Sequence, residues 1–101
     1  MNRKEKLLKI RATYGIDAQL KKFNEETFEV IEAIIGYEAC GRADVIKSSS
    51  KKHIAEEIAD VLVMLEQFKL YYNIKNDDIE KIMDYKIDRQ IKRIEESRER
   101  K

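Results

Sequence analysis

Residues 51–72 read KKHIAEEIADVLVMLEQFKLYY, and this stretch decides the fold. Its apolar residues recur every three or four positions, which is the period of an α-helix. One row holds the larger apolar side chains, namely Ile54, Ile58, Val61, Leu65, Phe68 and Tyr72. Others cover much of the remaining surface, namely Ala55, Ala59, Leu62, Val63 and Leu70. The pattern predicts a helix from about Lys51 to Tyr72, ending near Asn73 and buried on most sides.

Two carboxylates interrupt this apolar surface. Glu57 and Asp60 are three residues apart, so their side chains leave the helix on one face, about 60° apart. Val61, Met64 and Phe68 share that face. Burying two carboxylates in such surroundings costs several kcal/mol unless a positive charge compensates them. The sequence therefore predicts a cation close to this pair.

A second acidic pair with the same spacing lies on the preceding predicted helix. Asp17 is placed to cap this helix, which we expect to run to about Cys40 and to end at Gly41. Its apolar arc consists of Leu20, Phe23, Thr27, Val30, Ile31 and Ile34. Glu29 lies opposite that arc, with Glu25 and Glu32, and Glu26 lies at one flank. Taken alone, these glutamates are typical of a solvated face; beside Glu57 and Asp60 they can complete a cation site.

Two further helices complete an all-α prediction. The first runs from about Arg3 to Thr13 and ends at Tyr14-Gly15, where glycine can adopt a left-handed conformation. The last is capped by Asn76 or Asp77 and runs from about Asp78 into a charged tail, residues 97–101, that frays after Ser97. Residues 41–50 form a loop whose serines can cap the next helix. Short connections favour a four-helix bundle in which the two long helices are antiparallel.

The ligand chemistry indicates a hard cation. Four carboxylates without cysteine or histidine suit Mg²⁺, with Mn²⁺ as a possible substitute. The one histidine, His53, lies outside the Glu-x-x-His spacing that a di-iron centre needs, and we expect it on the surface.

The two acidic segments also match a family. Residues 25–29, EETFE, fit a Glu-Glu-x-x-Glu motif, and residues 56–60, EEIAD, fit a Glu-Glu-x-x-Asp motif. On consecutive helices about 30 residues apart, the pair resembles the MazG-type all-α nucleoside triphosphate pyrophosphohydrolases, a superfamily that includes the dimeric dUTPases. Flanking residues 14–19, YGIDAQ, and 59–62, ADVL, agree with the resemblance. It covers roughly Gly15 to Arg93, within one expected MazG-like domain spanning residues 1–101.

The resemblance implies Mg²⁺-dependent cleavage between the α- and β-phosphates of a nucleoside triphosphate, which releases a monophosphate and pyrophosphate. It implies that the metal ligands are Glu26, Glu29, Glu57 and Asp60. Glu25 is a candidate general base, although a role as a surface glutamate is nearly as well supported. Candidate substrate contacts are Lys86, Arg89, Gln19 and Asn24. For each of these four residues an ordinary place on a helix surface stays an alternative.

The composition of the chain bears on its binding partners and its location. Acidic and basic residues nearly cancel, with a formal net charge of +1, which gives no reason to expect nucleic-acid or membrane binding. The single cysteine and the charged segment 1–6 predict a reducing, cytoplasmic location without a signal segment. A chain of 101 residues buries a modest core, so we expect a homodimer or homotetramer.

Two alternatives to catalysis remain open. The same fold can serve as a catalytically inactive helical interaction module, which the nearly all-round apolar residues 54–70 would suit. Nucleic-acid binding through the C-terminal segment is weaker, because Glu95, Glu96 and Glu99 interrupt its basic residues. No residue fixes the base or the sugar, so standard dNTPs, dUTP, dCTP and damaged nucleotides all stay open. The length of the chain favours the MazG-like side of the superfamily and a house-cleaning role for the nucleotide pool.

Overall fold

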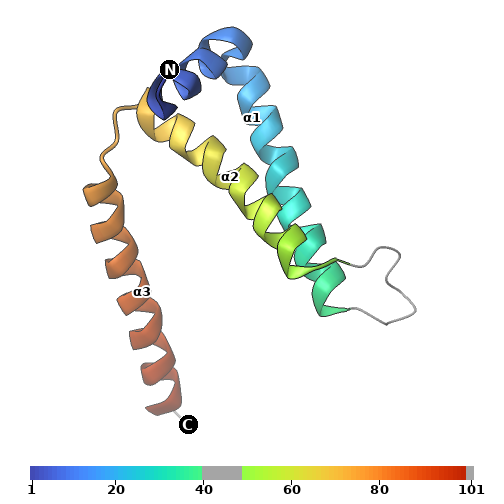
Figure 1. Ribbon diagram of the computed structural model, residues 1–101. Coiled ribbons are helices and arrows are strands. Elements are labelled where there is room, and N and C mark those ends of the chain that lie inside the picture. Colours follow the sequence, from blue (N-terminus) through green and yellow to red (C-terminus); the bar gives the residue numbers. More distant parts are fainter. Residues whose placement is uncertain (40–48, 100–101) are drawn as a thin grey trace. The chain divides into compact units, whose positions relative to one another are not determined.

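The computed structural model describes residues 1–39 and 49–99, and these residues form three helices and no strand (Figure 1). The helices are α1 (Arg3–Glu38), α2 (Lys51–Tyr71) and α3 (Asn76–Glu99). The chain divides into two compact units, Met1–Tyr71 and Tyr72–Lys101. The first unit holds α1 and α2, and the second holds α3. The all-α class is confirmed for the described residues, whereas a four-helix bundle is not supported.

Helix α1 contains the break that the sequence predicted at Gly15. Gly15 has φ 81° and ψ 168°, while the residues on either side are helical, so two expected helices form one kinked helix. This backbone region is open almost only to glycine. A Cβ atom at Gly15 would meet nothing within 4 Å, so the constraint is conformational rather than steric. Asp17 therefore lies inside a helix and is not the N-cap that the sequence predicted; Asn2 caps α1, accepting a 2.8 Å hydrogen bond from the Glu5 amide.

Helix α2 packs antiparallel against α1 and forms a helical hairpin with it, as predicted (Figure 1). Ser50 caps α2, because its hydroxyl accepts a 3.1 Å hydrogen bond from the His53 amide. At the other end, Asn73 adopts a positive φ of 55°, which is typical of the residue that terminates a helix. Both boundaries agree with the sequence prediction. The predicted helix end at Cys40 and Gly41, and most of the predicted loop, lie outside the described residues.

The face through which α1 and α2 meet agrees only in part with the predicted one, since Phe23, Val30 and Phe68 are half-buried as part of it. The buried side chains of the two helices include Gln19, Glu57 and Gln67, and Gln67 is only 1% exposed. Between them Phe23 and Phe68 form an edge-to-face pair with ring centroids 5.5 Å apart. Several side chains that we predicted to be in the core are exposed instead, namely Leu20, Ile31, Ile34, Ile58, Leu65 and Tyr72. The helices meet at one edge of their apolar arcs, and this leaves the rest of each arc uncovered.

The segment before Gly15 also packs within this unit. Leu7 and Arg11 are buried, and the Arg11 guanidinium carbon lies 3.4 Å from the centroid of the Tyr71 ring. A guanidinium over an aromatic face gains a cation–π attraction, and the ring shields it from water. The kink at Gly15 therefore lets the first turns of the chain cover the end of α2.

Helix α3 begins at Asn76, two residues before the predicted start. The Ile79 amide bonds the Lys75 carbonyl at 3.3 Å, so Lys75 occupies the N-cap position in place of Asn76 or Asp77. Asp77 and Asp78 lie in the first turn, where their charges stabilise the positive end of the helix dipole. The helix continues through Ser97 to Glu99, so fraying after Ser97 is not observed as far as Glu99. No described helix is long and apolar enough to cross a membrane.

Candidate metal centre

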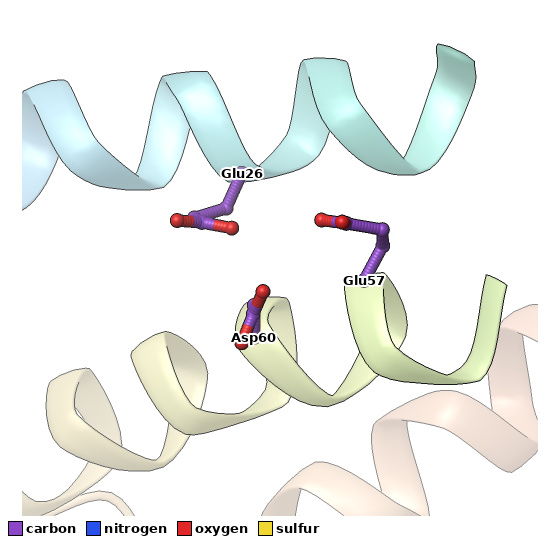
Figure 2. A group of neighbouring side chains, drawn as sticks. All are labelled: Glu26, Glu57 and Asp60. Atoms are coloured by element: carbon purple, nitrogen blue, oxygen red, sulfur yellow. The ribbon is translucent and has the colours of Figure 1, made fainter. Parts of the chain in front are cut away.

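Three of the four predicted metal ligands converge between α1 and α2. Glu26 projects from α1, and Glu57 and Asp60 project from α2 toward it (Figure 2). One carboxylate oxygen from each residue lies within 4.8 Å of the other two. The convergence follows from helix geometry, since the three-residue spacing places Glu57 and Asp60 on one face and the antiparallel hairpin places Glu26 opposite them.

Burial makes two members of this cluster, Glu26 and Glu57, costly without a compensating charge, whereas Asp60 is exposed and not buried as the sequence predicted. Glu57 is 9% exposed, and Glu26 is half-buried. The Oε2 atoms of Glu26 and Glu57 are buried and have no hydrogen-bond partner among the described residues. A buried carboxylate oxygen without a partner is unfavourable unless it is protonated or binds a cation. The two oxygens therefore need a ligand or a proton.

The neighbouring basic side chains offset this charge only in part. Lys22 Nζ lies 3.4 Å from Glu26 Oε1, but the lysine side chain is 58% exposed and its charge is well solvated. His53 Nε2 lies 3.8 Å from Glu57 Oε1, within reach of a weak ion pair when the imidazole is protonated. His53 is half-buried, so it is less exposed than the sequence predicted. Neither contact reaches the two unpartnered Oε2 atoms.

The pKa of Glu57 reports the same imbalance. It is raised above its ordinary value of 4.5, first by burial and then by a hydrogen bond between the Glu57 and Glu29 side chains. The negative charges of Glu29 and Asp60 raise this pKa further, whereas His53 lowers it. Three acidic groups from two helices thus influence one another, and Glu57 keeps its proton to a higher pH than an ordinary glutamate does.

The remaining acidic candidates differ in their surroundings. Glu29 is exposed but interacts with Glu57, so it borders the cluster without belonging to the three-oxygen group. Glu25, the candidate general base, is exposed on α1. The structure gives Glu25 no contact that distinguishes it from another surface glutamate.

The predicted substrate contacts lie in three different settings. Gln19 is buried, with its Oε1 lacking a hydrogen-bond partner among the described residues, and lies seven residues before Glu26 on the same face of α1. Seven residues correspond to about 10 Å along a helix. Asn24 is exposed. Lys86 and Arg89 are exposed on α3, in the other unit, and Arg89 lies 5.7 Å from the centroid of the Tyr85 ring.

Two polar residues near this face were not identified from the sequence. Gln67 lies seven residues after Asp60 on α2, and both atoms of its amide group are buried without a hydrogen-bond partner among the described residues. Arg11 is also buried, and its Nη1 has no hydrogen-bond partner among the described residues. The seven-residue spacing of Gln67 from Asp60 was visible in the sequence, matching that of Gln19 from Glu26. Nothing in the sequence indicated that Arg11 would be buried.

The donor set fits a hard divalent cation. Oxygen ligands about 2.1 Å from Mg²⁺ are about 3 Å apart when adjacent in an octahedron and about 4.2 Å apart when opposite. Carboxylate oxygens within 4.8 Å of one another need to shift only a little to reach these separations. Three or four carboxylates also leave room for water and phosphate oxygens, which Mg²⁺ commonly keeps among its ligands.

Comparisons with protein-family models, with curated proteins and with solved structures found no match. The resemblance to the MazG-type family therefore rests on the two acidic motifs and stays a prediction.

Proposed function

We propose that the chain is a Mg²⁺-dependent nucleoside triphosphate pyrophosphohydrolase whose metal ligands are Glu26, Glu57, Asp60 and, after a side-chain rotation, Glu29. The observation that carries this proposal is the group of three carboxylate oxygens within 4.8 Å of one another between two helices. The unpartnered buried oxygens of Glu26 and Glu57 support it, because a cation would satisfy both. The MazG-like spacing of the acidic motifs supplies the reaction class.

In this proposal some acidic residues bind the metal and another accepts a proton. Divalent metal bound to the carboxylates would neutralise phosphate charge and lower the pKa of a water ligand. Glu26, Glu57 and Asp60 hold their oxygens on rigid helices, which limits the reorganisation that binding requires. Glu25, one residue before Glu26, is proposed to accept the proton of the attacking water. Glu25 is exposed on α1.

Substrate contacts are proposed at two distances from the metal ligands. Gln19 lies about 10 Å from Glu26 along α1, a separation that suits contact with the base or sugar of a nucleotide whose triphosphate lies at the carboxylates. Asn24 is a second candidate on the same helix. We propose a homodimer or homotetramer as the working form.

The first test replaces one ligand without changing its shape. Asp60→Asn should lower Mg²⁺-dependent pyrophosphate release by about 100-fold or more, because changes to groups that only support a metal ligand already cost 10- to 100-fold. Pyrophosphate release is measured with a panel of nucleoside triphosphates, and calorimetry measures Mg²⁺ and Mn²⁺ binding. Circular dichroism should show unchanged helix content.

The matched control is Glu32→Gln, which removes an exposed carboxylate of α1 outside the cluster. It should leave pyrophosphate release and metal binding unchanged. Full activity of Asp60→Asn would refute the ligand assignment.

A second candidate function is a non-catalytic interaction module. The exposed apolar side chains on both helices favour it, since Phe28 is 59% exposed on α1 and Leu62 is 54% exposed on α2. A module of this kind need not bind metal. Absence of both Mg²⁺ and Mn²⁺ binding in the wild-type chain would therefore favour the module over the enzyme.

A further inference from the structure

Helix α3 carries an apolar stripe that nothing in its own unit covers. The stripe consists of Ile79, Met83, Ile87, Ile91 and Ile94, which follow one another at steps of three or four residues. None of the residues of α3 is buried, and Ile87 is 56% exposed. Among the described residues of this unit, α3 is the one helix. A helix with an open stripe of this length requires a partner surface.

The two flanks of the stripe carry opposite charges. At about 100° per residue, Asp77, Asp84 and Glu95 fall on one flank, and Glu80 lies within the stripe between Ile87 and Ile91. Lys86 and Arg93 fall on the other flank, and Arg89 lies farther round the helix, next to Asp78 and Glu96. Two basic residues also lie on the acidic side, namely Arg98, near the end of the helix, and Lys81, which is farther from the stripe. The stripe thus has an acidic side and a basic side.

This asymmetry selects one orientation for a pair of identical helices. When two helices pack through the same stripe in parallel, each flank meets the opposite flank of the partner; when they pack antiparallel, like flanks meet. Parallel packing of α3 therefore places acidic side chains against basic ones on both sides. Antiparallel packing places acid against acid and base against base, which is repulsive.

We propose that α3 is a self-association helix that packs in parallel, and in register, against α3 of a second copy of this chain. In this register Asp84 of one copy is level with Lys86 of the other to within about 3 Å along the axis, and Glu95 is level with Arg93 to the same extent. Each pair occurs twice by the two-fold symmetry. The pairing uses Lys86 and Arg93 to complement a carboxylate flank, and it assigns Lys86 a role other than the phosphate contact expected from the sequence. It specifies how two copies would meet, and it does not depend on catalysis.

The orientation is tested with single cysteines placed on the stripe of the full-length chain. Cys40→Ser first removes the native thiol, and Met83→Cys or Gln90→Cys is then added; Gln90 lies on the stripe because it is three residues after Ile87 and four before Ile94. Each variant is equilibrated in a glutathione redox buffer and analysed on a non-reducing gel. In a parallel pair both variants should form disulfide-linked homodimers, about tenfold more than the control Lys92→Cys on the opposite side of the helix.

The outcomes separate the possible occupants of the stripe. In an antiparallel pair, only one position along the helix can lie opposite the same position of the partner, so residues 83 and 90 cannot both do so. Cross-linking of only one of the two cysteine variants would therefore overturn the parallel arrangement. Cross-linking that occurs only when the two variants are mixed would overturn it as well. If α3 instead docks on the hairpin of its own chain, or on a different protein, neither variant cross-links above the control, and the proposal fails.

Charge reversal gives an independent measurement. Asp84→Lys with Glu95→Lys should weaken self-association about tenfold by analytical ultracentrifugation, because both flanks become basic. Adding Lys86→Glu and Arg93→Glu exchanges the signs of the two flanks and should restore it. Failure of the four-residue variant to recover would overturn the flank pairing even if the cysteines cross-link.

Discussion

The hairpin of α1 and α2 buries charged groups, whereas helix α3 exposes apolar ones. Between the hairpin helices, the carboxylates of Glu26 and Glu57 have buried oxygens without hydrogen-bond partners among the described residues. Along α3, large apolar side chains are exposed while the charges lie in solvent on both flanks. Buried charge and exposed apolar surface are both unfavourable in an isolated chain. A cation or a proton would offset the buried charge of the hairpin, and another apolar surface would cover the stripe of α3.

This contrast predicts that a substitution on α3 can weaken self-association without weakening Mg²⁺ binding by the hairpin. Ile87→Asp places a charge in the middle of the α3 stripe and should weaken self-association about 100-fold, since the carboxylate must be desolvated or the helices must separate. Mg²⁺ binding to the hairpin, measured by calorimetry, should persist, because the three carboxylates come from α1 and α2. Sedimentation velocity over a range of concentrations measures the self-association.

Tyr85→Asp is the matched control, because Tyr85 is 64% exposed and lies away from the stripe. It should leave the self-association constant within about threefold of the wild type. If Ile87→Asp loses Mg²⁺ binding and Tyr85→Asp keeps it, the metal site depends on the partner copy. The prediction that self-association and Mg²⁺ binding are independent would then be wrong.

The second prediction concerns the stability of the hairpin as pH changes. The native pKa of Glu57 is raised above 4.5, so the native chain binds more protons than the unfolded chain as pH rises above that value. The contribution of Glu57 to the free energy of unfolding is therefore fully present below pH 4.5 and is lost as pH rises through the native pKa. Without metal, the melting temperature should be lower at about pH 7.5 than at about pH 5.

Glu57→Gln separates this effect from other titrations. The amide has the shape of the protonated acid and does not titrate, so the metal-free variant should melt above the wild type near neutral pH and show a flatter pH dependence. Mg²⁺ should raise the melting temperature of the wild type near neutral pH and have little effect on Glu57→Gln. A wild type whose metal-free melting temperature rises steadily from about pH 5 to about pH 7.5, parallel to Glu57→Gln, would contradict the assigned cause.

Helix content and the convergence of acidic groups were predictable because both depend on spacing along one rigid element. The break at Gly15, the Ser50 cap and the end near Asn73 each depend on one residue with a strong conformational preference. Glu57 and Asp60 had to share a face once α2 was a helix. An antiparallel neighbour with the same acidic spacing then sufficed to bring Glu26 close.

The packing of the helices could not be predicted in the same way. Apolar periodicity shows that a helix has a face to bury but not which surface covers it, so Leu20 and Ile58 were expected inside and are exposed. Burial of Gln67 and Arg11 depends on the angle between helices and on the kink at Gly15, and neither follows from composition. The partner of α3 could not be predicted either, because the apolar stripe shows a face to be covered but not the surface that covers it.

The smallest expected effect concerns a single local contact of the hairpin. Ser50→Ala removes the hydroxyl that accepts the His53 amide and leaves that donor at the start of α2 without its cap. The loss should lower the free energy of unfolding by about 1 kcal/mol, measured by urea denaturation. Glu57 lies two turns after Ser50 on α2. The free energy of Mg²⁺ binding should therefore weaken by no more than the free energy of unfolding does, which is about 1 kcal/mol.

Ser49→Ala provides the control from the adjacent residue. The Ser49 hydroxyl is buried and has no hydrogen-bond partner among the described residues, so replacing it with a methyl group removes an unsatisfied polar atom. Ser49→Ala should therefore leave stability unchanged or raise it slightly, opposite in sign to Ser50→Ala. Equal losses in the two variants would mean that Ser50 does not act as a cap. The start of α2 would then depend on its packing against α1, as α3 is proposed to depend on a second copy.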